Sequence, residues 1–154
     1  MKTVLIYGDS SDVLSVTLAD MIEFISHSSI QLDYWVIKRF EAITNSSFAY
    51  SDVRIFEQLV VDSIFGLLFT YEQICNLSDG VEQGINFTIL GFTKSLRLQV
   101  DDSGSVIFNP IEMKFELIDS SYWEVSASNV ETVAEMLAFF KSQGAELMTS
   151  SLID

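Results

Sequence analysis

Side chains that react near neutral pH are scarce in this sequence. Its 154 residues include one histidine (His27), one cysteine (Cys75) and one proline (Pro110), and 8 lysine and arginine residues stand against 22 aspartate and glutamate residues. A single cysteine excludes an internal disulfide and a zinc site built from several cysteines, and it agrees with a reducing cytoplasm. The shortage of cations argues against binding to nucleic acid or to an anionic membrane surface, because both are negatively charged.

Long hydrophobic runs are also missing. The longest apolar stretch, residues 59–69, is interrupted by polar residues and a glycine, and it is well short of the roughly 20 residues that a membrane-spanning helix needs. The apolar run at residues 4–7 is shorter than the core of a secretory signal, which takes about 7–15 apolar residues. We therefore expect a cytoplasmic protein with no membrane segment.

What the chain does contain is enough apolar material for one core and a large excess of negative charge. Hydrophobic residues make up 49% of it, including 12 Phe, 5 Tyr and 2 Trp, so burial can offset the entropy lost on folding. The formal net charge is −14, and acidic residues are spread along both halves of the chain. These numbers predict a single globular domain over residues 1–154 with an anionic surface.

The spacing of apolar residues predicts an α+β protein. A high content of β-branched and aromatic residues predicts a strand at 3–7, and alternation predicts another at 32–40. A spacing of three to four predicts a helix from about Ser11 to His27, capped by one of the polar residues at 9–11. A second, mostly buried helix is expected from Ser51 or Asp52 to about residue 71, where Gly66 allows a break. In the strand at 32–40, strict alternation places Val36 and Phe40 on one face and Trp35 and Ile37 on the other.

From residue 85 the period changes to two. The alternation predicts an antiparallel meander of four or five strands over residues 85–125, with one apolar and one charged face. Ser128 and Glu131 form a capping-box pattern that predicts the start of a last helix, and Gly144 marks its end. We expect a mainly antiparallel sheet with about three helices packed on one face.

One triplet carries a resemblance to an enzyme family. Gly8-Asp9-Ser10, which follows the strand predicted at 3–7, resembles the first block of the GDS(L)/SGNH esterase family. In that family the serine is the nucleophile, so the resemblance implies a small hydrolase that uses Ser10. The family's G-x-N-D block and the D-x-x-H block that supplies its base are missing from this sequence. The alternative is that Gly8 ends the strand and that Asp9 and Ser10 cap the next helix.

Other reactive or ligating groups have structural explanations. His27 comes at the end of a predicted helix, where a cation is favourable, and Cys75 lies beside an apolar stripe as a small core residue would. Asp101 and Asp102 precede Ser-Gly, which is common turn chemistry, and they lack the spacing of a calcium loop. We expect no metal site and no cofactor.

The charged face of the meander is the remaining candidate for a binding site. Its acidic residues, together with Tyr122 or Trp123 as an aromatic anchor, would form an anionic patch that binds a partner protein. The alternative is an ordinary solvated sheet face, which Arg97 and Lys114 on that face favour. The residues of the candidate patch are Asp101, Asp102, Glu112, Glu116, Asp119, Tyr122, Trp123 and Glu124.

Charge and the lack of a catalytic constellation together predict a function class. We expect a non-catalytic protein that binds and neutralises a basic protein partner, in the form of an immunity protein (antitoxin) for a cationic, nuclease-like bacterial toxin domain, because an acidic surface steers fast association with such a domain. Two alternatives stay open: the small hydrolase at Gly8-Asp9-Ser10, and an acidic interaction subunit of a larger assembly whose charge serves solubility.

Overall fold

Nine strands and four helices make up the part of the chain that the structure, a computed structural model, describes: residues 1–7, 16–94 and 96–150. In sequence order they are β1 (Lys2–Tyr7), α1 (Leu18–His27), β2 (Tyr34–Thr44), α2 (Val53–Asp62), β3 (Leu67–Thr70), α3 (Tyr71–Asp79), β4 (Val81–Phe92), β5 (Arg97–Val100), β6 (Val106–Asn109), β7 (Met113–Ile118), β8 (Tyr122–Ala127), α4 (Val130–Ser142) and β9 (Glu146–Ser150).

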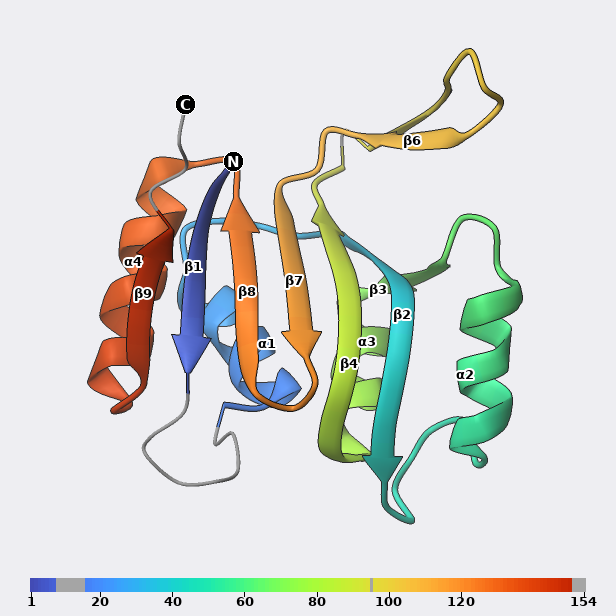
Figure 1. Cartoon of the computed structure of the whole chain (residues 1–154), viewed down its shortest axis with the longest axis horizontal. Coiled ribbons are helices and arrows are strands. Elements are labelled where there is room, and N and C mark those ends of the chain that lie inside the picture. Colours follow the sequence, from blue (N-terminus) through green and yellow to red (C-terminus); the bar gives the residue numbers. More distant parts are fainter. Residues whose placement is uncertain (8–15, 95, 151–154) are drawn as a thin grey trace.

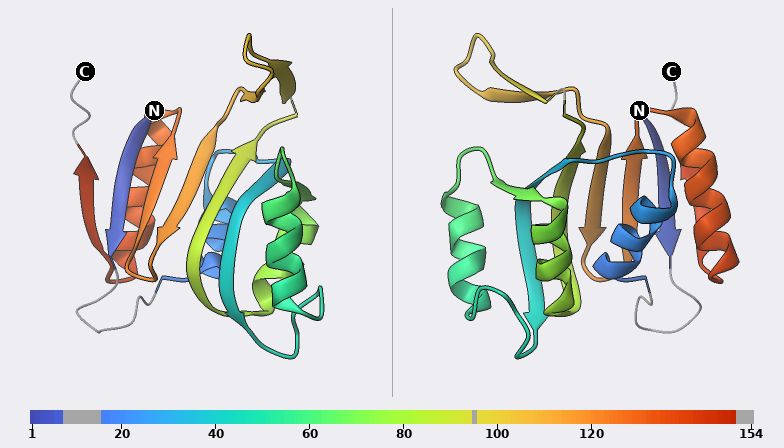
Figure 2. Two further views of the ribbon diagram at one scale, coloured as in Figure 1. Left: turned by 45° about the vertical axis from the view of Figure 1, so that its right-hand side comes forward. Right: turned by 180° about the vertical axis from the view of Figure 1, so that it is seen from behind.

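Seven of these strands form one sheet in the order β3-β2-β4-β7-β8-β1-β9, and every neighbouring pair is antiparallel. Helices α1, α3 and α4 lie side by side on one face of the sheet, and α2 stands beside β2 at one edge (Figure 1; Figure 2). The predicted α+β class, with a mainly antiparallel sheet and helices on one face, is confirmed. We call the face that these helices leave uncovered the open face.

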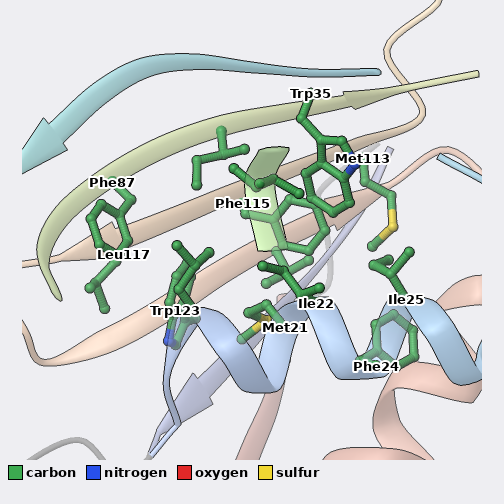
Figure 3. Close-up of a cluster of buried hydrophobic side chains, with 14 of the residues drawn as sticks. Met21, Ile22, Phe24, Ile25, Trp35, Phe87, Met113, Phe115, Leu117 and Trp123 are labelled. Atoms are coloured by element: carbon green, nitrogen blue, oxygen red, sulfur yellow. The ribbon is translucent and has the colours of Figure 1, made fainter. Parts of the chain in front are cut away.

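The core lies between the sheet and its helices. Figure 3 shows side chains of α1 meeting side chains of β2, β4, β7 and β8. The Trp35 ring stacks on Phe115 with 5.5 Å between ring centroids. Each such side chain contributes about 1.5–3 kcal/mol when it leaves water. The labelled residues of this cluster, each at most 5% exposed, are Met21, Ile22, Phe24, Ile25, Trp35, Phe87, Met113, Phe115, Leu117 and Trp123.

Helix α1 begins later than the sequence predicts. Its N-cap is Thr17, which has extended backbone angles; the Thr17 side chain accepts from the Asp20 amide at 3.2 Å, and the Asp20 carboxylate accepts from the Thr17 amide at 2.7 Å. This reciprocal capping box satisfies two free N–H groups. The predicted start near Ser11 is therefore wrong, and the cap residues expected at 9–11 lie outside the described residues.

Strand β2 contains a bulge that changes which side chains it buries. Ile37 pairs with Ile89 and Arg39 with Thr88, so Lys38 is one extra residue in β2. The bulge reverses the alternation beyond it, and Phe40 joins Trp35 and Ile37 on the helix side of the sheet. The prediction that Phe40 shares a face with Val36 is therefore wrong.

The second predicted helix is divided into helix, turn, strand and helix. Asp52 caps α2 as expected, but α2 ends at Asp62, and residues 67–70 form the edge strand β3. The expectation that this helix is mostly buried is also wrong, because Phe56 and Val60 are its only buried residues. Helix α2 lies along the part of β2 that β3 does not pair with, and there the Glu57 carboxylate accepts from the Ala42 amide at 3.2 Å.

The predicted meander is interrupted by a projecting hairpin. Strand β4 pairs directly with β7, and β7 with β8, while β5 and β6 form a separate two-stranded sheet that extends from the end of β4 (Figure 1). Phe108 of the hairpin packs on Phe92 with 5.5 Å between ring centroids. At α4, Asn129 is the N-cap and Ser128 instead donates to Glu112, so the predicted capping box does not form.

Candidate protein-binding surface

Three residues of the predicted patch meet on the open face. Glu116 and Glu124 are directly opposite each other on β7 and β8, and Tyr122 lies on the same face of β8, two residues before Glu124. The Tyr122 ring is 5.4 Å from the ring of Tyr7 on β1. These side chains are partly exposed, so a partner could reach two carboxylates beside an aromatic pair.

Cations reduce the negative charge of the open face. The Lys114 ammonium lies 2.8 Å from Glu116, and the Arg39 guanidinium lies 2.9 Å from Glu41. A hydrogen bond from Asn86, together with one from Arg39, holds the pKa of Glu41 below its ordinary value. The open face is therefore a mixed surface in which acidic and basic groups neutralise each other locally.

The other acidic residues of the predicted patch lie apart. Asp101 and Asp102 are at the tip of the β5–β6 hairpin, where Asp101 accepts hydrogen bonds from the Ser103 hydroxyl and from the Ser103 and Ser105 amides. The Ser103 and Ser105 hydrogen bonds lower the pKa of Asp101. Asp101 therefore serves the turn. The structure does not unite the eight predicted residues into one patch.

Two further carboxylates of the prediction are also separate, and one aromatic residue does not reach the surface. Glu112 precedes β7 and accepts from the Ser128 hydroxyl at 2.7 Å, whereas Asp119 is in the β7–β8 turn at the other end of the strands. Trp123 is 0% exposed, and its indole N–H donates to the Val16 carbonyl at 2.8 Å. Trp123 is a core residue, so its predicted role as an anchor for a partner is wrong.

A more uniform acidic surface lies on the opposite side of the molecule. Helices α1, α3 and α4 together carry six carboxylates and one lysine, Lys141. They form one layer that faces solvent (Figure 2). We call the outer surface of these three helices the acidic helix layer. Its carboxylates are Asp20, Glu23, Glu72, Asp79, Glu131 and Glu135.

The acidic helix layer was not identified from the sequence. None of these acidic residues is at a buried position of its helix, and the separation of apolar from acidic positions within each helix is visible in the sequence. What the sequence does not reveal is that α1, α3 and α4, separated by long stretches of chain, come to lie on the same face of one sheet.

Two of the reactive groups singled out in the sequence, His27 and Cys75, lie within the described residues, and both have structural roles. His27 is in the last turn of α1, with its ring 6.1 Å from Phe139 and its Nε2 3.9 Å from Glu23. Burial raises the pKa of the Cys75 thiol, which keeps it protonated at neutral pH and unsuited to nucleophilic attack. The Gly8-Asp9-Ser10 triplet lies outside the described residues.

A hollow lies at the N-terminal end of α1. It has a volume of about 250 Å³ and is lined by residues of the α1 start, β4, β7, the β7–β8 turn and β8. Of the described residues that line it, Glu82 alone carries a carboxylate and none is a histidine, cysteine or lysine. No pairing of a nucleophile with a base is present among them.

No group of three or more metal-ligating side chains gathers within residues 1–7, 16–94 and 96–150. No helix in these ranges is both long and apolar enough to cross a membrane.

Comparison of the chain with models of protein families, with curated proteins and with solved structures found no match.

Proposed function

We propose that this chain is a non-catalytic binding protein that neutralises a basic protein partner, acting in the cytoplasm as an immunity protein (antitoxin) for a cationic, nuclease-like toxin domain. The observation that supports this function is the acidic helix layer, in which six carboxylates stand against one lysine on three adjacent helices. It lies on a molecule whose net charge is −14.

Such a layer suits a partner that binds phosphates. A nuclease domain holds its substrate with lysine and arginine side chains, and a rigid array of carboxylates can occupy the same cations and keep nucleic acid out. Long-range attraction also raises the association rate, which favours capture of a toxin before it acts. The layer is rigid because each of its helices is anchored by buried residues such as Phe24, Ile74 and Phe140.

The test begins by identifying the partner. Tagged full-length chain is used to capture proteins from its native host at low salt, and a captured basic protein is then purified and its binding measured by surface plasmon resonance. We expect the association rate to fall steeply as the salt concentration rises. We also expect the chain to inhibit the nuclease activity of the captured protein.

Two matched triple variants locate the binding face. The first variant neutralises three exposed carboxylates of the acidic helix layer through Glu23→Gln, Glu72→Gln and Glu131→Gln. The control variant removes the same amount of charge elsewhere through Asp102→Asn, Glu124→Gln and Glu146→Gln. The first variant should slow association at least about tenfold at low salt, and the control should change it much less. If no basic protein binds, the proposed function fails; equal effects of both variants would contradict the helix layer as the site.

A further inference from the structure

Helix α2, the turn that follows it and the start of β3 expose an unusual amount of apolar surface. Six large apolar side chains there are between 46% and 83% exposed, although neighbouring Phe56 and Val60 are almost fully buried. So many exposed apolar side chains within residues 55–68 are typical of a protein–protein contact, whereas single exposed apolar residues are ordinary. We call these residues the α2 patch: Ile55, Leu59, Val61, Ile64, Phe65 and Leu68.

A polar row with opposite charges at its ends runs through the α2 patch. Arg54, Gln58 and Asp62 are four residues apart and exposed, so they follow one line along the outer side of α2. The Gln58 amide donates to the Asp62 carboxylate at 2.8 Å. At 100° per residue, Val61 flanks this row on one side and Ile55 and Leu59 flank it on the other.

Such a row is complementary to itself when reversed. If two α2 helices pack antiparallel about a two-fold axis near Gln58, Arg54 of each copy faces Asp62 of the other, and the apolar flanks of the two copies meet. A strongly basic partner fits this surface less well, because the groove beside it holds three cations, Lys38, Arg39 and Arg54, against the two carboxylates of Glu41 and Glu57.

We propose that the α2 patch is the interface of a homodimer in which α2 packs antiparallel on α2 of a second copy. Helix α2 stands at the edge of the sheet, beside β2 and away from the centre of the acidic helix layer (Figure 2). The dimer therefore presents two acidic helix layers, and its existence does not depend on the proposed toxin-binding function.

Salt distinguishes this contact from a complex with a basic partner. Each copy carries a charge of −14, so two copies repel each other at long range. Salt screens that repulsion and leaves the apolar contacts intact, and this gain outweighs the weakening of the two Arg54–Asp62 pairs. The dimer should tighten as NaCl is raised from about 20 mM to about 500 mM, whereas the complex with a basic protein should weaken over the same range.

The first experiment is sedimentation equilibrium of the full chain over a range of protein concentrations at low and high salt. We expect the mass to rise from the 17.3 kDa of one chain to twice that value. Leu59→Glu with Ile64→Glu should weaken the dimer at least about tenfold. The matched control, Val130→Glu with Met148→Glu, adds the same charge at positions 59% and 58% exposed on α4 and β9, and should change dimerisation by less than about twofold.

A charge exchange tests the antiparallel arrangement without removing apolar surface. Arg54→Asp or Asp62→Arg alone should weaken the dimer about three- to tenfold, and the double exchange should restore it. Both substitutions favour the helix, since they place an acid at its N-terminus and a base at its C-terminus, and circular dichroism verifies the fold.

Three results would overturn the homodimer. They are a monomer mass at every concentration in high salt, equal weakening by the α2 patch variant and its control, and a double exchange no better than the single ones. None of them affects the measurements on the acidic helix layer.

Discussion

The two tryptophans are buried to nearly the same extent, but their indole N–H groups differ. Trp123 is 0% exposed and donates to the Val16 carbonyl, whereas Trp35 is 1% exposed and its N–H has no hydrogen-bond partner among the described residues. A buried polar group without a partner loses its hydration and regains nothing. The N–H of Trp123 therefore stabilises the fold, and that of Trp35 opposes it.

Replacing each tryptophan by phenylalanine measures this difference. Both Trp123→Phe and Trp35→Phe lose ring volume, but only Trp123→Phe also breaks a buried hydrogen bond. We expect Trp123→Phe to lower the free energy of unfolding by about 1–3 kcal/mol more than Trp35→Phe does. Urea unfolding followed by circular dichroism gives both values, and a larger loss for Trp35→Phe would contradict the assignment.

Glu41, on the open face, makes the free energy of unfolding depend on pH. Hydrogen bonds from Asn86 and Arg39 favour its charged form and lower its pKa from the ordinary 4.5. A carboxyl whose pKa is lower in the folded than in the unfolded chain stabilises the fold above the unfolded pKa. That contribution is lost as the pH falls through the folded pKa.

Glu41→Gln removes this titration with little change of shape. The stability difference between the wild type and Glu41→Gln should be largest above about pH 5 and should shrink as the pH is lowered toward about 3. Urea midpoints of both proteins across this range test it. A difference that stays constant with pH would show that Glu41 does not titrate abnormally.

The turn between α2 and β3 depends on a glycine. Gly66 has φ +82°, and a Cβ atom there would lie 2.7 Å from the Ile37 carbonyl oxygen and 2.7 Å from Cγ1 of Val36. Gly66 is therefore needed both for its backbone angle and for the close approach of β3 to β2. Helix α2 has already ended at Asp62, and this pair of demands fixes the path of the chain from the turn into β3.

A second glycine with the same angle provides the control. Gly104 also has φ +82°, but a Cβ atom there would have no neighbour within 4 Å. Gly104→Ala should cost about 1–2 kcal/mol from backbone strain, and Gly66→Ala should cost about 1–3 kcal/mol more because of the collision with β2. Equal losses in urea unfolding would rule out the packing constraint at Gly66.

For the molecule as a whole, the dominant electrostatic property is repulsion within the fold. A charge of −14 exceeds the magnitude of about 2–8 that solubility requires in a small domain, and it disfavours the compact state. The acidic helix layer concentrates part of that charge, since six carboxylates and one lysine occupy three neighbouring helices.

Added salt should therefore stabilise the fold. We expect the urea midpoint to rise between about 20 mM and about 500 mM NaCl, because screening weakens the repulsion. The rise should be smaller for the triple variant Glu23→Gln, Glu72→Gln and Glu131→Gln, whose charge is three units less negative. A midpoint that falls with salt would show that favourable ion pairs outweigh the repulsion.

Much of the local structure could be predicted from the sequence, but less of the candidate surface. Alternation located most strands of the sheet because a half-buried strand needs an apolar residue at every second position. The alternation rule failed at Lys38, where a bulge reversed the faces of β2. It also failed at β5 and β6, whose residues alternate like those of a strand in the main sheet although the two strands pair only with each other. Trp123 was assigned to a surface because apolar periodicity does not show which neighbour covers a ring.

The sequence by itself determined the α+β class, the scarcity of catalytic side chains and the large negative charge, because these follow from composition and from short-range periodicity. Tertiary structure alone decided which charges lie together. It brought Asn86 within hydrogen-bond distance of Glu41 on the open face, united the carboxylates of α1, α3 and α4 in one layer, and left apolar side chains of α2 exposed. These outcomes depend on contacts between segments far apart in the chain, which no local pattern encodes.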